Sequence, residues 1–265
     1  MILYIAGYGR SGSTVLDLKL GKRFGCVSLG EISSLYADAN RYQSARCGCG
    51  SGYDECSLWG PLIRNGGFAE KVRMMRIYQT PMMLSAWLRV VSLIRNGFIP
   101  QRAAFLSVLR APIQRAEEQY PGGIYVDSSK TTWFSVRRPL FLAELGYQVV
   151  IIHIRRPLKD VLASVRLGDN KVLMGDRKQE KLFRLPRAAF SYFFANSYAS
   201  LLRFRFPYLQ VSQVELRDNE DAVLKKVHDF LVQQGLDTYR RYEAAHVVSG
   251  NRLKFSYTGK KDKEG

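Results

Sequence analysis

The residues best suited to chemistry lie near the start of the chain, in the stretch YIAGYGRSGSTVLD (Tyr4–Asp17). An apolar run ends there in glycines, an arginine and three hydroxyl residues, and apolar spacing then resumes. Glycines let a backbone approach a ligand closely, and the amides at the start of a helix attract an anion. The stretch therefore predicts an anion-binding turn between a buried strand and a helix.

The spacing of Gly7, Gly12 and Thr14 fits the phosphate-binding loop of ATPases, but Ser13 occupies the position of its lysine. In those enzymes the lysine reaches the β- and γ-phosphates, and the next hydroxyl holds Mg²⁺. A ligand with a single 5′-phosphate-linked group needs only amides, hydroxyls and a nearby cation, which Arg10 supplies. The loop therefore argues against a nucleoside triphosphate.

A second candidate anion site lies in VVIIHIRRPLKDVLAS (Val149–Ser164). A buried strand is predicted to end at its paired arginines, and the proline after them is well placed to begin a helix. Arg156 and Ser164 would then face one phosphate, through charge-assisted hydrogen bonds of roughly 1.5–3 kcal/mol each. The alternative for Arg156 is a surface ion pair with Asp160, one helical turn along.

The composition favours an anionic partner. Among 265 residues, 40 are Lys or Arg and 23 are Asp or Glu, giving a net charge of +17. Such a surplus suits a nucleotide, a polyanionic sugar, a membrane surface or a nucleic acid, and it also suits a merely basic surface. The apolar run at the start is too short for a signal sequence or a membrane span, so a cytoplasmic protein is expected.

The elements that must position these loops alternate between strands and helices. Three unalternated apolar runs predict strands buried on both faces, and two weaker runs are further candidates. In chain order these five are Ile2–Ala6, Cys26–Leu29, Ile124–Val126, Val149–Ile154 and Tyr208–Val211. The pattern predicts a three-layer α/β fold with a P-loop-like, mostly parallel central sheet. One intervening helix is expected to bury a face made of Phe190, Phe194, Ser197 and Leu201.

The chain is expected to form one domain over residues 1–265. Residues 61–122 are predicted to be a helical insertion, serving either as a cap near the site or as a plain structural layer. Residues 256–265 form a polar tail.

Together, GRSGST (Gly9–Thr14) and RPLKDVLAS (Arg156–Ser164) resemble the two nucleotide-binding elements of sulfotransferases that use 3′-phosphoadenosine 5′-phosphosulfate (PAPS). Arginine at Arg10 is typical of the carbohydrate and tyrosyl-protein branches. Four further matches, in the expected order, resemble the bacterial branch: SLGE (Ser28–Glu31), CGCGSGYDECSLW (Cys47–Trp59), VDSSK (Val126–Lys130) and HVVSGNRLKF (His246–Phe255).

The resemblance implies a set of site residues. Glu31 would be the catalytic base, although it also suits the N-terminus of a helix. Lys130, assisted by Arg10, would stabilise the leaving phosphate oxygen, and Asp127 is a structural residue or a second-choice base. The predicted cofactor-binding residues are Arg10, Ser11, Gly12, Ser13, Thr14, Arg156, Ser164, Asn251 and Arg252.

The implied co-substrate is PAPS, its product is 3′-phosphoadenosine 5′-phosphate (PAP), and no metal is required. The acceptor is expected to be a hydroxyl or amine of a small molecule, natural product or sugar, with neither nucleic acid nor membrane as partner. His153 lies in a buried strand pattern and is expected to be a core residue. Two alternatives stay open: a P-loop-type kinase of small molecules, and a basic nucleic-acid-binding protein.

Three of the four cysteines lie close together, with the spacing C-x-C-x₆-C over Cys47, Cys49 and Cys56. This spacing matches no strong zinc signature, although a His or Asp could complete a site. A Cys49–Cys56 disulfide is unexpected in a reducing compartment. The expectation is therefore reduced thiols packed near Trp59, without a metal.

Overall fold

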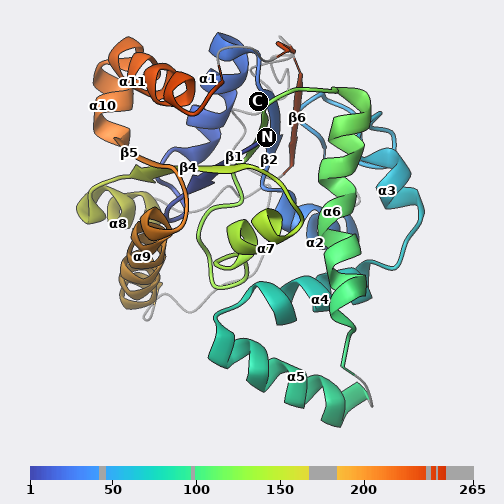
Figure 1. Cartoon of the computed structure of the whole chain (residues 1–265). Coiled ribbons are helices and arrows are strands. Elements are labelled where there is room, and N and C mark those ends of the chain that lie inside the picture. Colours follow the sequence, from blue (N-terminus) through green and yellow to red (C-terminus); the bar gives the residue numbers. More distant parts are fainter. Residues whose placement is uncertain (42–45, 97–98, 167–183, 237–239, 243, 249–265) are drawn as a thin grey trace, which may run out of the picture.

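A computed structural model describes residues 1–41, 46–96, 99–166, 184–236, 240–242 and 244–248. Its centre is a sheet of six strands: β1 (Ile2–Ala6), β2 (Val27–Gly30), β3 (Tyr125–Asp127), β4 (Val149–Arg155), β5 (Tyr208–Ser212) and β6 (Ala245–Val248). Their order across the sheet is β5-β4-β1-β3-β2-β6, and all five pairings are parallel (Figure 1). A parallel sheet needs a crossover between its strands, and helices supply it here.

Seven of the described α-helices pack around the sheet (Figure 1). They are α1 (Ser13–Phe24), α2 (Leu35–Arg41), α7 (Arg138–Glu144), α8 (Leu158–Arg166), α9 (Arg184–Leu201), α10 (Gln213–Asp218) and α11 (Glu220–Gln233). The short 3₁₀ helices are η1 (Ile32–Ser34) and η2 (Leu202–Phe204). Pro139 lies in the first turn of α7, and the Asn219 side chain caps α11 by accepting from the Ala222 amide at 3.2 Å.

The central strand β1 is buried on both faces of the sheet, which is why it is apolar throughout. Alternate side chains of β1 point to opposite faces. Leu3 and Ile5 pack in a core with α1, α10 and α11, whereas Ile2 and Tyr4 pack in another with α2 and α7. Figure 1 shows helices on both sides of the strands. The predicted three-layer α/β class is therefore confirmed.

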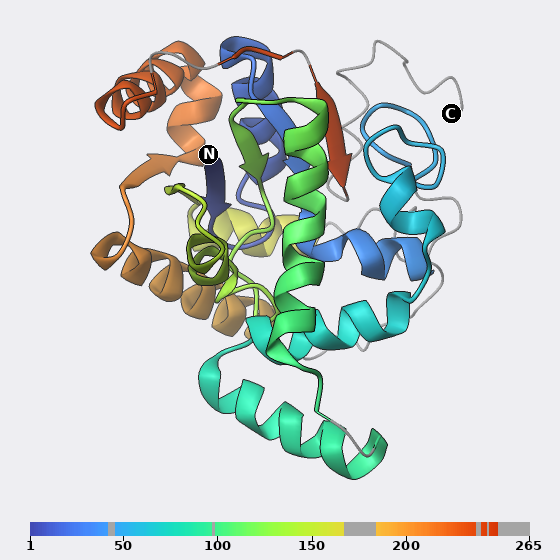
Figure 2. The ribbon, with the colours of Figure 1, turned by 45° about the vertical axis from the view of Figure 1, so that its right-hand side comes forward.

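Residues between β2 and β3 carry further helices: α3 (Gly60–Arg64), α4 (Phe68–Gln79), α5 (Met82–Asn96) and α6 (Arg102–Gln119). In both ribbon views α5 lies at the end of this group, far from the sheet (Figures 1 and 2). The helix α6 returns along the group toward the sheet and delivers the chain to β3 (Figure 2). Helices of this region thus contribute to the core on the α2 and α7 side.

The structure differs from the predicted elements in two ways: the buried face of α9 and an additional strand. Phe190 and Leu201 are 64% and 59% exposed, so the predicted buried face of α9 is not the one that packs. The face that packs instead carries small residues and polar anchors, namely Ala188, Tyr192, Ala195, Asn196 and Ala199, and small side chains allow a close approach to β4. The sixth strand, β6, was not predicted, because four residues at the edge of a sheet leave too short a pattern.

Among the described helices, none is long and apolar enough to cross a membrane.

Candidate active site

The order of the strands indicates where along their carboxyl ends a ligand would bind. After β1 the chain builds β2 and β3 on one side of it, then crosses to build β4 and β5 on the other. Open α/β sheets bind ligands at the carboxyl ends of strands where the order reverses in this way. Here the reversal lies between β1 and β4, and both predicted anion-binding segments follow those two strands.

The loop after β1 is fixed to the turn after β3 by two hydrogen bonds. The Thr131 amide donates to the Gly7 carbonyl at 2.9 Å, and the Gly7 amide donates to the Thr131 hydroxyl at 3.2 Å. Gly7 has a φ of 131°, and a Cβ there would lie 2.5 Å from the Ile154 carbonyl oxygen of β4. Only glycine fits this position, which brings the loop against both neighbouring strands.

The structure brings the two predicted anion-binding segments together. Arg156, which follows β4, donates from Nη1 to the Arg10 carbonyl at 3.0 Å. Arg10 in turn donates from Nη1 to the Ser164 hydroxyl on α8, at 3.4 Å. The Arg156 carbonyl accepts from the Tyr192 hydroxyl of α9 at 2.8 Å. The loop after β1 is therefore joined through Arg10 to both Arg156 and Ser164, the two residues predicted to bind a phosphate.

Two predicted site residues have a strained backbone. Arg10 and Lys130, with φ of 67° and 63°, are the non-glycine residues with positive φ in the described part of the chain. Such a conformation costs about 1–3 kcal/mol for a residue with a Cβ, and it persists only where surrounding contacts enforce it. Strain of this kind concentrates at functional sites, so its occurrence at these two residues points to the same place as the topology.

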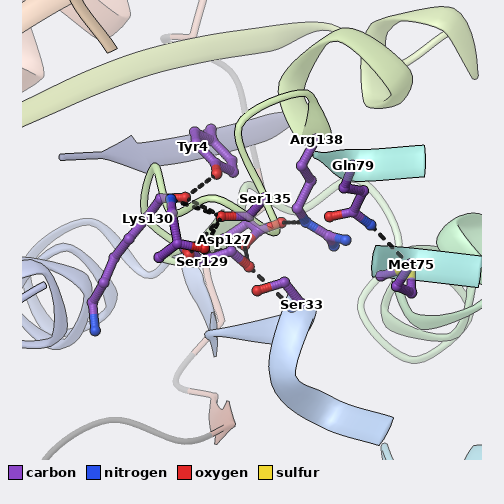
Figure 3. Close-up of polar contacts among 10 residues, drawn as sticks. Tyr4, Ser33, Met75, Gln79, Asp127, Ser129, Lys130, Ser135 and Arg138 are labelled. Carbon is purple, nitrogen blue, oxygen red and sulfur yellow. Dashed lines mark hydrogen bonds and ion pairs between the residues drawn. The ribbon is translucent and has the colours of Figure 1, made fainter. Parts of the chain in front are cut away.

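Contacts from β1 and from the turn after Lys130 enforce its conformation (Figure 3). The Lys130 carbonyl accepts from the Tyr4 hydroxyl and, at 2.8 Å, from the Ser135 hydroxyl. Burial raises the pKa of Tyr4, so its hydroxyl stays a donor. The sequence analysis did not identify Tyr4, Thr131 or Ser135. Nothing in a sequence pattern shows that a tyrosine in a strand, or a hydroxyl in a turn, bonds the backbone of a distant residue.

Glu31 and Lys130 form an ion pair at the carboxyl ends of β2 and β3. The side chains of Lys130 and Glu31 are 14% and 17% exposed, so the pair is largely shielded yet open to a ligand. Glu31 is held in place through its amide, which donates to the Val248 carbonyl of β6 at 2.9 Å. It also lies at the N-terminus of η1, the structural position that was the alternative to a catalytic role.

Asp127 is fully buried and has a structural role. Its Oδ2 pairs with Arg138 Nε at 2.6 Å, and both side chains are 0% exposed. Its Oδ1 accepts from the Ser129 amide at 3.0 Å and from the Ser129 hydroxyl. Figure 3 shows the Lys130 side chain extending away from this buried group. A carboxylate so enclosed shapes the turn that presents Lys130 and does not face a substrate.

A second buried carboxyl lies on α1, close behind the loop. Asp17 accepts from the Ser128 hydroxyl at 2.7 Å, and burial raises the pKa of Asp17 to about 7. Its neutral form is therefore well populated near neutral pH. This limits the negative charge next to an anion site.

The loop fits an anionic group. The buried Ser11 hydroxyl and Arg156 Nε, one from each predicted anion-binding segment, are among the buried polar atoms of the described residues that have no hydrogen-bond partner. Gly12 caps α1 without a side-chain hydrogen bond, so the first amides of the helix, around Ser13 and Thr14, are left for a ligand. Buried polar atoms without partners are costly, and an anion bound there would satisfy them.

Two predicted site residues, Asn251 and Arg252, lie outside the described residues. His153 is a core residue, as expected. Its Nδ1 lies 2.6 Å from the Tyr208 hydroxyl and its Nε2 lies 2.9 Å from the Asn196 Oδ1. Burial lowers the pKa of His153 to about 4. Both ring nitrogens are occupied, so His153 is not available as a base.

Two solved structures are similar to this chain. One is the sulfotransferase domain from the Synechococcus PCC 7002 olefin synthase, with 20% sequence identity, a TM-score of 0.46, and coverage of 89% of this chain and 74% of that domain. The other is the sulfotransferase domain from the curacin biosynthetic pathway, with 15% identity, a TM-score of 0.49, and coverage of 97% and 82%. Both are sulfotransferase domains, the family that the sequence motifs resemble. No family model and no curated protein matches the chain.

Proposed function

We propose that the protein is a PAPS-dependent sulfotransferase that acts on a hydroxyl or amine of a small molecule. The observation that carries the proposal is the Glu31–Lys130 pair at the carboxyl ends of two strands, next to a loop fitted to an anion. A carboxylate and an ammonium in that position are the groups that group transfer to a hydroxyl requires: a base for the attacking oxygen and a cation for the leaving one.

The nucleotide would be held by the two segments that the structure brings together. The amides at the start of α1, with Ser11, Ser13 and Thr14, would bind the 5′-phosphosulfate. Arg156 and Ser164 would bind the 3′-phosphate, and Arg10, which belongs to the loop after β1, contacts both of these residues. Asn251 and Arg252 remain predicted contributors from the C-terminal loop.

When bound, PAPS supplies the sulfuryl group that is transferred to the acceptor oxygen or nitrogen. Glu31 accepts the proton that the acceptor loses, at a carboxylate oxygen. Lys130 donates a hydrogen bond to the bridging oxygen of the leaving phosphate, where negative charge develops. Arg10 adds positive charge beside the same group. The chain's part is to position these groups and to stabilise charge, as in phosphoryl transfer.

The missing lysine of the ATPase loop supports this proposal over the kinase alternative. Ser13 stands at the position of that lysine and is buried in the first turn of α1. A ligand without a γ-phosphate needs neither this lysine nor Mg²⁺.

Aromatic residues beyond Lys130 suit an acceptor with an apolar part. Trp133 stacks on Phe194 and Phe190 of α9, with ring centroids 3.7 and 6.0 Å apart. Phe190 and Phe134 are at least half exposed, so this aromatic surface is open to a small molecule.

The activity is tested by incubating the protein with PAPS and a panel of alcohols, phenols, amino sugars and amines, and following PAP release and acceptor mass. Sulfated product that disappears in Glu31→Gln supports the proposal. Absence of any product, with ATP hydrolysed or transferred instead, would favour the kinase.

A further inference from the structure

The cysteine loop meets a histidine that is distant in sequence. Cys47, Cys49 and Cys56 follow α2, whereas His246 lies on β6, yet their ligand atoms all lie within 4.8 Å of one another. Cys47 and Cys56 are 0% and 1% exposed, His246 is 7% exposed, and Cys49 is partly buried. The structure thus supplies the fourth ligand that the cysteine spacing alone lacked.

Four of the six distances among these ligand atoms are close to those of a tetrahedral site. Sulfur and nitrogen ligands at Zn²⁺ bond lengths of about 2.3 and 2.1 Å would place sulfurs about 3.8 Å apart and a nitrogen about 3.6 Å from each sulfur. Cys56 Sγ lies 3.6 Å from Cys47 Sγ and 3.8 Å from Cys49 Sγ. His246 Nδ1 lies 3.3 Å from Cys56 Sγ and 3.8 Å from Cys47 Sγ.

The same distances do not fit a disulfide. The S–S bond is about 2.05 Å long, whereas Cys56 Sγ lies 3.6 and 3.8 Å from the other two sulfurs, and all three cysteines are free. A disulfide would also leave a third buried thiol beside the imidazole. Four convergent ligand atoms with no competing arrangement favour a metal over oxidation.

The surroundings of His246 orient it as metal ligands are oriented. Its Nε2 lies 2.7 Å from the hydroxyl of Tyr120, the residue that follows α6, and its Nδ1 faces the sulfur cluster. Its carbonyl accepts from Trp59 Nε1 at 2.9 Å. A ligating histidine usually bonds an outer partner through its other ring nitrogen, and that partner fixes its tautomer and orientation.

We propose that Cys47, Cys49, Cys56 and His246 bind a structural Zn²⁺ ion. Three thiolates and one imidazole complete a tetrahedral set, which leaves no open position for a substrate and therefore indicates structure and not catalysis. The soft sulfur ligands select Zn²⁺ over Mg²⁺ or Ca²⁺. The proposal differs from the expectation, drawn from the cysteine spacing alone, of reduced thiols without a metal.

The ion would secure the edge of the sheet that holds Glu31. It would link the cysteine loop to β6, where the Gly48 amide already donates to the Val247 carbonyl at 3.0 Å. The next residue of β6, Val248, accepts from the Glu31 amide at 2.9 Å. A Cβ on Gly30, whose φ is 73°, would lie 2.5 Å from the Val248 backbone, so the two strands are closely packed here.

The test is a metal analysis of the whole chain, purified with a reductant and without a chelator. Mass spectrometry of the metal should find one equivalent of zinc per chain. Exchange into Co²⁺ should give the visible absorption of tetrahedral thiolate-bound cobalt. Cys49→Ser, the least buried ligand, should lose the stoichiometric metal, and Tyr120→Phe should weaken zinc binding about 10–100-fold.

Cys26→Ser is the matched control, because Cys26 is a buried cysteine in the other core and outside the cluster. It should keep the full equivalent of zinc. Wild-type protein with no zinc, a Cys49–Cys56 disulfide in the purified protein, or equal metal loss in Cys26→Ser and Cys49→Ser would each overturn the proposal. The readout is metal content, so its outcome is independent of the proposed sulfotransferase activity.

Discussion

Glu31 and Lys130, which are 99 residues apart in sequence, form an ion pair at the carboxyl ends of the adjacent strands β2 and β3. Each satisfies the other's charge in the absence of ligand. A nucleotide that draws the Lys130 ammonium to its leaving oxygen would free the Glu31 carboxylate to accept a proton. Nucleotide binding would thereby make the Glu31 carboxylate available as the catalytic base.

Replacing the base should abolish turnover without affecting nucleotide binding. Glu31→Gln keeps the size of the side chain but accepts no proton, so kcat should fall by about 10²–10⁴-fold. PAP affinity, measured by calorimetry, should change by less than about threefold. Glu220→Gln is the matched control, because Glu220 pairs with Lys19 at the surface. Equal rates in the two variants would contradict the assignment of Glu31.

Removing the ammonium of Lys130 should slow the chemical step. Lys130→Ala should lower kcat by about 10²–10³-fold, the cost of losing one donor to a developing oxyanion. Lys130→Gly relieves the positive φ but also lacks the ammonium, so it should be as slow while being at least as stable. Restored activity in Lys130→Gly would show that the backbone, and not the charge, matters.

Neighbouring arginines should differ sharply in their contribution to binding. Arg156→Ala should weaken PAP binding about 10–150-fold, since a charge-assisted hydrogen bond contributes about 1.5–3 kcal/mol. Arg155, at the exposed end of β4, is the control, and Arg155→Ala should leave PAP affinity unchanged. A similar loss of PAP affinity in both variants would show that Arg156 contributes only to the general positive charge and makes no specific contact with the phosphate.

Acid should destabilise the fold through His153. Its pKa is lowered by burial to about 4, so the unfolded chain, with an ordinary pKa of about 6.5, binds more protons between these values. Stability present above pH 6.5 is lost as the pH falls toward 4, by about 2 kcal/mol at pH 5. Asp17, whose pKa burial raises to about 7, acts in the opposite direction over the same range. The test is therefore the difference between the two proteins: from pH 7.5 to 5, urea unfolding should show the wild type losing about 2 kcal/mol relative to His153→Gln.

His228→Gln is the control for that experiment, because His228 is exposed on α11. It should retain the wild-type dependence of stability on pH. A His153→Gln protein with the same pH slope as wild type would show that His153 is not the group responsible.

Local patterns predicted much of this architecture. The five predicted strands are each within one residue of the observed bounds, because strands buried on both faces are continuous apolar runs. The two candidate anion-binding segments were visible for a different reason: glycines, hydroxyls and arginines that meet after a strand suit the binding of an anion. The proximity of Arg10 to Arg156 and Ser164 followed from the parallel order that these strands adopt.

Long-range contacts escaped prediction. Nothing in the spacing of the cysteines identifies His246, 190 residues after Cys56, as their neighbour, because β6 is short and lies at the edge of the sheet. The buried face of α9 was predicted wrongly since aromatic residues outweigh alanines in any hydrophobic pattern. In the structure those aromatics stack on Trp133 and leave the alanines to pack.

The central claim is that the loop after β1 binds a 3′,5′-bisphosphate nucleotide, and a thermal-shift titration tests it most directly. PAP is compared with ADP, with and without Mg²⁺. At a hundredfold excess over Kd, PAP should stabilise the fold by about 2.7 kcal/mol, a rise in Tm of about 5–10 °C that Arg156→Ala reduces. No shift with PAP, or a shift only with ADP and Mg²⁺, would contradict the account and favour the kinase.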